Sequence, residues 1–477
     1  MAFLIVLASL CFLMFVAYKG YSVILFAPIA AMGAVFLTDL FVSPAGQPSL
    51  VAPMFTGLFM DKMVVFVKLY FPVFLLGAVF GKVIELSGFA KSIVTSVISL
   101  VGRERAIFSI VCVCAILTYG GVSLFVVVFA VYPFAAEMFK AGGIPKRLIP
   151  GTIALGSFTF TMDSLPGTPQ IQNVIPTTFF KTDLYAAPWL GVIGGIFILI
   201  VGMIYLEWQR HKGMSAGEGY GTGHIMEPEP FDDSKEKLAN PFIAILPLIM
   251  VGVSNWVFTN KLIPAIYTGE THQFVPAVIG KAAPVVQKIG AIKGIWSVEA
   301  ALLVGILFVF IFAFKPVISK FAEGTKAAIA GALLASMNTA SEYGYGAVIA
   351  AMPGFLVIAQ ALGAIPNPLV NEAITVTTLA GITGSASGGM GIALAAMSDV
   401  FIASAAANNI PLEVFHRVAS MASGGMDTLP HNGAVITLLM VTGMTHKTSY
   451  KDIFAVTVIK TTAVFVIIGV YYATGIV

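Results

Sequence analysis

The sequence predicts an all-α, polytopic membrane protein built from two inverted repeats. Of its 477 residues, 58% are hydrophobic and only 10% are charged, whereas soluble domains carry about 25% charged residues. Apolar segments of roughly 18 to 23 residues recur along the chain, which is the length of a membrane-spanning helix. A charged, helix-breaking motif occurs twice, as MDSLP at 162–166 and as MDTLP at 426–430. One copy in each half indicates an internal repeat with a binding site at the breaks.

Residues 1–105 are predicted to form the scaffold helices and a surface arm of the first repeat. The predicted spanning helices of this part are 2–18, 21–41 and 63–85. A connection rich in Gly, Pro and Ser separates the last two at 42–60. No basic residue precedes Lys19, so the first segment is interpreted as a spanning helix and not as a signal peptide. The segment 88–102 carries polar residues throughout, and we expect it to lie at the membrane surface.

Residues 106–207 are predicted to form the transport part of the first repeat. Basic residues flank both ends of the apolar segment 106–139, which predicts a re-entrant hairpin with both ends cytoplasmic and its tip in the membrane. The tip has the sequence GGVS, at 120–123. The segment 148–180 is too long for one helix and contains the first motif, so two half-helices are expected there. A spanning helix over 186–207 completes the repeat.

The second repeat is expected to follow the same order after a polar cytoplasmic linker at 208–240. Residues 241–369 would form its scaffold and surface arm, and 370–477 its transport part. The predicted elements are helices at 241–259, 294–314 and 323–341, a surface segment at 347–362, a hairpin at 370–406, a broken helix at 413–445 and a last helix at 452–474. This gives about ten spanning helices and two hairpins. Each half has an odd number of crossings, so the halves should be inverted, and the distribution of Lys and Arg agrees.

Two hairpin tips and two broken helices would bring several helix ends together near the membrane midplane. Helix N-termini favour anions, and C-termini favour cations. The predicted substrate-binding residues are Gly120, Gly121, Ser123, Ser164, Thr168, Asn173, Ser385, Ser387, Gly388, Gly389, Thr428, His431 and Asn432. Most are neutral, and no Lys or Arg lies in the tips or near the motifs. We therefore expect helix N-termini and hydroxyls to bind an anionic substrate, with His431 as the one side chain that could become cationic.

Three acids are predicted to couple transport to an ion: Asp163, Asp427 and Glu342. A buried carboxyl group can take up a proton on one side and release it on the other when the site changes its exposure. The alternative for the two aspartates is a structural one, in which each caps the N-terminus of a half-helix. For Glu342 the alternative is an interfacial acid at a helix end. For the glycine-rich tips it is close helix packing.

Four runs of the sequence stand out together: GGVS at 120–123, DSLPGTPQ at 163–170, NTASE at 338–342 and MDTLPHN at 426–432. With them the chain resembles the gluconate permease family, within the wider ion transporter superfamily, and the resemblance covers essentially the whole chain. It implies a proton symporter of the bacterial inner membrane that imports small hydroxy-carboxylates such as gluconate, D-serine or 3-hydroxybutyrate. It also implies a homodimer in which an elevator-type transport domain, here 106–207 and 370–477, moves against a fixed scaffold.

The first break departs from the family pattern. Gluconate transporters of this family carry a Pro-Pro-His-Pro signature there, whereas this chain has DSLPGTP at 163–169. The departure favours a short hydroxy-monocarboxylate over gluconate. Sodium coupling stays open, because unwound carbonyls with Asn and Thr side chains also suit Na⁺. A channel and an intramembrane aspartyl protease are the remaining alternatives. We predict no enzymatic activity, cofactor, metal site or nucleic-acid partner.

Overall fold

The computed structural model describes the whole chain except residues 20, 45, 123, 225–226, 229–237, 277–283, 358–364 and 431. The described part is nearly all helical, apart from one antiparallel hairpin of β1 (Thr271–Phe274) and β2 (Val285–Lys288), in which Thr271 pairs with Lys288. Seven of the described helices are long and apolar enough to cross a membrane. The predicted class, an all-α polytopic membrane protein, is confirmed.

The first scaffold is more helical than the sequence predicts. Its elements are α1 (Ala2–Tyr18), α2 (Val23–Phe41), α3 (Val51–Met54), the π-helix η1 (Phe55–Met60), α4 (Asp61–Leu86), α5 (Phe89–Val101) and the 3₁₀ turn η2 (Arg103–Arg105). The connection expected at 42–60 was therefore wrong from Val51 onward. Pro53 does not prevent a helix here, because it lies in the first turn, where its missing N–H costs no hydrogen bond.

The first transport part has the predicted hairpin and broken helix. The hairpin is α6 (Ala106–Tyr119) and α7 (Leu124–Ala141), and the broken helix is α8 (Leu148–Ser157), α9 (Phe160–Asp163) and α10 (Ile171–Phe180). The hairpin turn includes Gly121 at φ +95°, a conformation that side chains rarely adopt. The following helix, α11 (Pro188–Ser215), extends past its predicted end at 207, so part of the expected linker is helical.

The second half repeats this order with a different scaffold. Its elements are α12 (Pro241–Val257), the π-helix η3 (Phe258–Leu262), α13 (Ile263–Ile266), α14 (Ile289–Ala350), α16 (Pro368–Thr383), α17 (Ala386–Asn408), α18 (Leu412–Ser423), α19 (Gly433–Thr442) and α20 (His446–Thr474). The helices predicted at 294–314 and 323–341 form one kinked element, α14. Its backbone leaves helical geometry at Ala313, close to Pro316. The element thus consists of two helices that meet at a kink, which agrees with the two predicted helices.

The difference between seven apolar helices and about ten predicted spans has three sources. The pair that merges into α14 counts once, α1 is only 17 residues long, and the half-helices of both breaks are short. In the other direction, α17 of the second hairpin is long enough to count. The surface segment predicted at 347–362 begins inside α14 and then falls partly outside the described residues.

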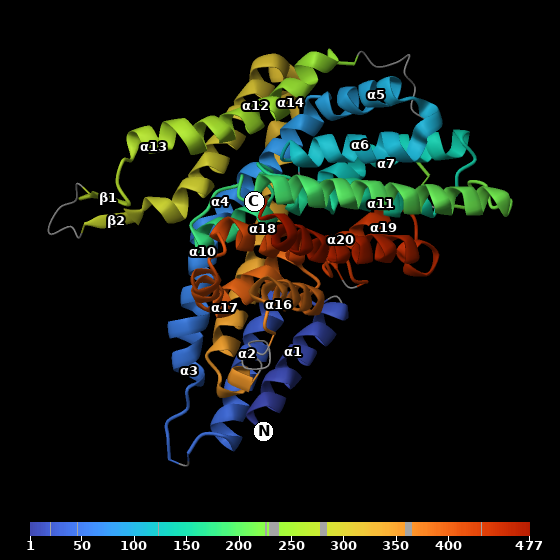
Figure 1. The fold of residues 1–477 in the computed structure, drawn as a ribbon. Coiled ribbons are helices and arrows are strands. Elements are labelled where there is room, and N and C mark those ends of the chain that lie inside the picture. The colour runs from blue at the N-terminus through green and yellow to red at the C-terminus, as the bar shows by residue number, and fades with distance from the viewer. Residues whose placement is uncertain are drawn as a thin grey trace.

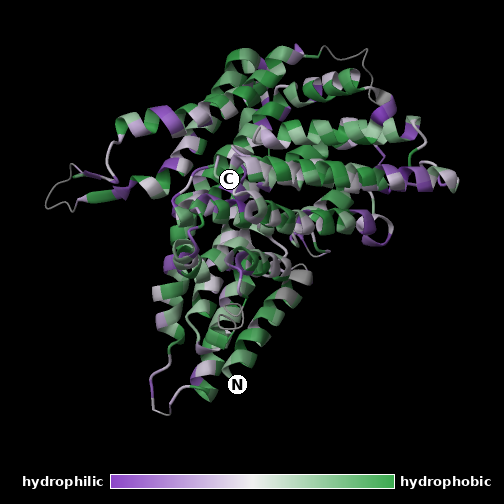
Figure 2. Ribbon diagram, viewed as in Figure 1, coloured by the Kyte–Doolittle hydropathy of each residue, from purple (hydrophilic) through white to green (hydrophobic). Residues whose placement is uncertain are grey.

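The transport parts of the two halves lie against each other. Helix α11 packs along α20, and α10 packs against α18, while α4 runs along α14 (Figure 1). One face of α11 exposes Ile196, Ile200 and Ile204, which are spaced four residues apart. The same helix buries Gly191 and Gly194 against its neighbours. Hydrophobic residues cover most of the long helices, and hydrophilic ones gather at the end of α11 and at the β-hairpin (Figure 2). An exposed apolar face on such helices is the surface expected in lipid.

Candidate functional site

A buried lysine joins the two copies of the duplicated motif. Lys460 lies on α20, and its Nζ is 3.1 Å from Oδ1 of Asp427 and 3.8 Å from Oδ2 of Asp163. It also donates a hydrogen bond to the carbonyl oxygen of Phe158. Asp163 and Lys460 are each 1% exposed, and Asp427 is 5% exposed. Two carboxylates from different repeats thus share one ammonium group in the protein interior.

The breaks in both helices let these side chains meet. Asp163 is the last residue of the short helix α9, and Asp427 lies in the turn between α18 and α19. Gly424 lies at the point of closest approach. A Cβ on residue 424 would lie 1.9 Å from Oδ2 of Asp163 and 2.9 Å from Nζ of Lys460. The glycine before the second motif therefore makes room for the carboxylate of the first.

A second buried cation holds the first break. Arg417 of α18 is fully buried and donates hydrogen bonds to the carbonyl oxygens of Asp163 (3.1 Å) and Ala186 (2.8 Å) and to Oδ1 of Asn173 (3.1 Å). Its neighbour His416 bonds Thr182 through Nδ1 and Asn173 through Nε2. Arg417 lies within the broken helix predicted at 413–445, but it was not among the predicted site residues. Helix α18 carries it into the interior.

The expectation that only His431 could be cationic was wrong. Lys460 lies in the predicted last helix, and Arg417 lies near the start of the second predicted broken helix. Both side chains nevertheless reach the motifs. Each lies in an otherwise apolar stretch predicted to be in the membrane, where an ionisable residue is by default a functional candidate. That signal was present in the sequence. His431 and Ser123 themselves lie outside the described residues.

Each break is also hydrogen-bonded to the hairpin tip of its own repeat. In the first repeat, the amide of Gln170 donates to the carbonyl of Thr118 (2.7 Å). In the second, the amide of Asn432 donates to the carbonyl of Gly384 (2.7 Å). The tip and the break of a repeat therefore form one unit, as a shared binding region requires.

The aspartates do not cap the half-helices that follow the breaks. Asn432 caps α19, because its Oδ1 accepts hydrogen bonds from the N–H groups of Ala434 and Val435. At the first break, Asp163 accepts instead from the hydroxyl of Ser164 at 2.8 Å, and no side-chain oxygen of the described residues caps α10. The capping alternative was wrong for both aspartates. Asp163 Oδ2 is buried and has no hydrogen-bond donor within the described part of the chain.

Several predicted substrate-binding residues serve the local structure. The amide of Asn173 donates to the carbonyls of Thr168 and Leu184, and the hydroxyl of Thr168 donates to the carbonyl of Thr161. The hydroxyl of Thr428 bonds that of Thr457 on α20. These groups position the breaks around Asp163 and Asp427.

The two hairpin tips have different surroundings. A Cβ on Gly120 would lie 2.5 Å from the side chain of Leu248, and one on Gly121 would meet Pro169 at 3.2 Å. The first tip is thus closely packed against apolar side chains. The second tip is polar: Ser385 accepts from the N–H of Gly388, and Ser387 lies 3.3 Å from the hydroxyl of Thr339. Gly389 packs on the backbone of Ala380 in the other hairpin helix.

Glu342 of α14 lies at this second tip. It is 3% exposed, and a Cβ on Gly388 would lie 1.5 Å from its Oε2. The interfacial alternative for Glu342 was wrong, since the side chain is in the protein interior. It does not reach the Asp163–Lys460–Asp427 cluster through any hydrogen bond or ion pair among the described residues.

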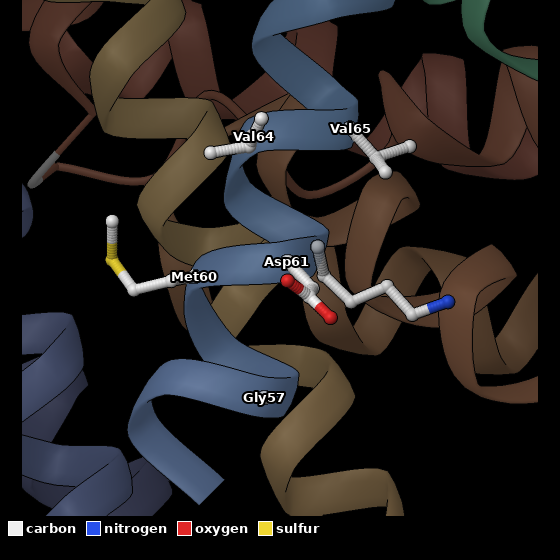
Figure 3. Close-up of a pocket in the computed structure, with 6 residues that line it drawn as sticks. Gly57, Met60, Asp61, Val64 and Val65 are labelled. Carbon is white, nitrogen blue, oxygen red and sulfur yellow. The ribbon is translucent and has the colours of Figure 1, made fainter. Parts of the chain in front are cut away.

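A hollow of about 460 Å³ opens on the surface of η1 and α4 (Figure 3). Its lining residues are Gly57, Met60, Asp61, Lys62, Val64 and Val65. None of them belongs to the predicted site. Val64 and Val65 are largely exposed, as in a groove on a lipid-facing helix.

The chain is similar to known transporters, although no family model matches it. The chain is 56% identical over 485 residues to the uncharacterized transporter YxjC of Bacillus subtilis (strain 168), and the match covers 100% of both chains. The crystal structure of the Alcanivorax borkumensis YdaH transporter, described as having an unusual topology, matches with a TM-score of 0.54 at 14% identity. That match covers 95% of this chain and 98% of the other, so it supports the fold. Both similar proteins are transporters.

Proposed function

This chain belongs to the family of the transporter YxjC and is a membrane transporter, not an enzyme; on that premise, we propose that it imports a small hydroxy-monocarboxylate together with protons. We place it in the inner membrane of a bacterium, as a homodimer that works by an elevator movement of 106–207 and 370–477. We propose a short hydroxy-monocarboxylate such as 3-hydroxybutyrate as the substrate.

The charge balance of the buried cluster is the observation that carries the proposal. Asp163 and Asp427 supply two negative charges, and Lys460 and Arg417 supply two positive ones, all of them at least nine-tenths buried. The cluster is therefore neutral when all four groups are ionised. An anionic substrate adds one negative charge, and an uncompensated charge in this environment is costly.

A proton solves this problem. If Asp163 or Asp427 takes up one proton as the carboxylate enters, the loaded cluster is neutral again. Asp163 is the better candidate, because its Oδ2 lacks a hydrogen-bond donor among the described residues and lies farther from Lys460 than Asp427 does. Uptake of substrate without a proton, or of a proton without substrate, would leave a net charge. The same balance can be met by Na⁺, which makes the coupling ion the first quantity to measure.

The test is uptake by the purified full-length protein in liposomes. Labelled 3-hydroxybutyrate, lactate, D-serine and gluconate would each be offered with an imposed proton gradient and, separately, with a sodium gradient. We expect accumulation of 3-hydroxybutyrate or lactate under the proton gradient and none of gluconate. Accumulation under the sodium gradient alone would overturn proton coupling. A lack of accumulation of all four acids would overturn the substrate class.

The Asp163→Asn variant tests the coupling site. We expect it to lose accumulation against a gradient, because the amide cannot take up a proton, while exchange of internal for external substrate continues. Asp39→Asn is the matched control, since Asp39 is an acid of α2 that accepts from Ser49 at the protein surface. Normal uphill uptake by Asp163→Asn would remove this residue from the coupling mechanism.

A further inference from the structure

One face of α14 near its C-terminal end carries three buried polar atoms without partners. They are Oδ1 of Asn338, Oγ of Ser341 and Oε2 of Glu342, none of which has a hydrogen-bond partner among the described residues. Residues three and four apart on a helix share one face, so the three side chains lie together. Buried polar groups are normally satisfied. Three unsatisfied atoms on one face indicate a place where a polar ligand belongs.

This face lies opposite the beginning of α17. Helix α14 packs on α17, and Thr339 of α14 contacts Ser387 in the first turn of α17. The first turn of a helix has free N–H groups and a positive end of the helix dipole. The hydroxyl of Ser385 binds one of these donors, the N–H of Gly388. The second tip therefore offers donors for a negatively charged group.

The carboxyl group of Glu342 points into this position. Its Oε2 lies where a side chain of residue 388 would be, at 1.5 Å from the ideal Cβ position. The hydroxyl oxygen of Ser385 lies 3.0 Å from the same ideal Cβ position. Gly388 is thus the residue that lets a carboxyl group approach the first turn of α17.

We propose that the first turn of α17 and the face of Asn338, Ser341 and Glu342 form the carboxylate-binding site, which Glu342 itself occupies until the substrate displaces it. The proposal rests on the proposed function and adds the place where the substrate binds. The incoming carboxylate would take the N–H groups of Ala386 and Ser387 in the first turn of α17, since Ser385 already binds that of Gly388. Ser341 and Asn338 would then bind the substrate hydroxyl, which gives a reason for hydroxy-acids.

Two like charges cannot share this position, so Glu342 and the substrate exclude each other. Glu342 must move away or become neutral when the substrate enters. The residue therefore acts as a resident competitor that keeps other small anions out of the tip. The tip is joined to the second break, which carries Asp427 of the charge-balanced cluster, by the hydrogen bond from Asn432 to the carbonyl oxygen of Gly384.

The test measures the charge at the tip without using any substrate. Cys11, Cys112 and Cys114 would be replaced by Ser, and a single cysteine would be introduced by Ser387→Cys. The reaction rates of this introduced cysteine in liposomes would be measured with a sulfonate-bearing methanethiosulfonate and with its trimethylammonium counterpart. We expect Glu342→Gln to raise the anionic-to-cationic rate ratio by roughly tenfold, since a helix N-terminus favours an anion once the resident one is removed.

Two further variants keep the result interpretable. Glu372→Gln is the control, because Glu372 is another fully buried acid without a hydrogen-bond partner among the described residues. It lies in the same hairpin but about three turns before the tip, and it should leave the ratio unchanged. If Glu342→Gln does not fold, Glu342→Asp should shift the ratio in the same direction by a smaller factor, because the shorter side chain withdraws from Gly388.

An unchanged ratio in the Glu342 variants would overturn the proposal. So would an introduced cysteine that reacts with neither reagent in any background, because the tip would then be closed to substrate as well. The proposed function fails separately, in the liposome uptake assay. A shifted ratio without uptake of any of the four acids would keep the site and discard the substrate.

Discussion

The two copies of the duplicated motif have similar sequences but different surroundings. The first break is held from the other repeat, since Arg417 and Ser420 of α18 donate to the carbonyl oxygen of Asp163. Within the described residues, the second break has no such cation from the first repeat. Its Asp427 pairs with Lys460 of its own repeat. The duplication thus preserves the helix break, while both cations of the cluster, Lys460 and Arg417, come from the second half of the chain.

The hairpin tips and the acids near them differ in the same way. The first tip packs against Leu248 and Pro169. Glu85, an acid near the end of α4 in the first repeat, is partly exposed and pairs with Lys82 three residues before it. Glu342 is buried at a polar tip. We conclude that the first repeat contributes apolar packing and the carboxylate of Asp163, and that the second contributes most of the charged groups.

The largest effect is expected from Lys460→Met, which removes the cation that the two breaks share. Two buried carboxylates would be left without it, and breaking such a pair costs about 3–5 kcal/mol. We expect loss of accumulation in liposomes and a clearly lower unfolding temperature in detergent. Lys82→Met is the control. It breaks the partly exposed pair with Glu85 and should cost less than about 1 kcal/mol.

Double variants show which break depends more on Lys460. Lys460→Met with Asp427→Asn should recover more stability than Lys460→Met with Asp163→Asn. Asp427 lies nearer to the ammonium, whereas Asp163 keeps its hydrogen bond from Ser164. Equal recovery in both double variants would show that the two breaks are equivalent, against the asymmetry described above.

A smaller effect is expected from Arg417→Lys, which keeps the positive charge but removes the planar guanidinium group with its several N–H donors. A lysine cannot donate to Ala186, Asn173 and the Asp163 carbonyl at once from the same position. We expect a loss of about 2 kcal/mol from the unsatisfied acceptors, measured by thermal unfolding. Arg210→Lys, at a more exposed pair with Glu207, should change little. Equal stability of Arg417→Lys and the parent would mean that charge alone holds the first break.

The sequence predicted the elements well where apolar length and helix breakers decide them. Both hairpins and both broken helices are present, because glycine and proline interrupt an otherwise apolar run. It also predicted the two helices that meet at the kink in α14, but it failed at 51–60, where a helix begins at Val51 with Pro53 in its first turn. Whether a proline ends, bends or starts a helix depends on packing that lies far away in the sequence.

The site could be predicted only in part for a similar reason. The motifs pointed to Asp163, Asp427 and Glu342, which are all buried in the structure. Lys460 and Arg417 were missed because each is a single cation in a helix that carries no motif. Their pairing depends on α20 and α18 packing against the first repeat, which a linear pattern does not contain. A search of the predicted membrane segments for cations that could balance Asp163 and Asp427 would have pointed to Lys460 and Arg417.

The smallest effect is expected from a substitution in the linker, whose residue Glu227 forms an ion pair with Lys146 of the first repeat. Lys146, just before α8, has a fully buried side chain, and its Nζ lies 2.6 Å from Oε1 of Glu227 in the linker. The corresponding start of α18 has Leu412 after Ile410-Pro411 and carries no cation there. The linker therefore holds the first broken helix and leaves the second without this contact.

Glu227→Gln should lower the free energy of unfolding by about 1 kcal/mol at pH 7, because a buried ammonium loses a charged partner that solvent already screens in part. Partial burial acts to raise the pKa of Glu227, but the hydrogen bond and charge of Lys146 outweigh it and hold this pKa below its usual value near 4.5. A lowered carboxyl pKa stabilises the fold above the unfolded-state pKa, and this stabilisation is lost as pH falls through the folded-state value. The difference between parent and variant should thus be constant from pH 8 to about pH 5, fall as pH drops below the unfolded-state pKa, and vanish once pH is below the folded-state pKa. Glu207→Gln is the matched control, since Glu207 is equally exposed but its partner Arg210 is not buried. A Glu227→Gln difference no larger than that of the control would mean that the linker does not hold the first repeat.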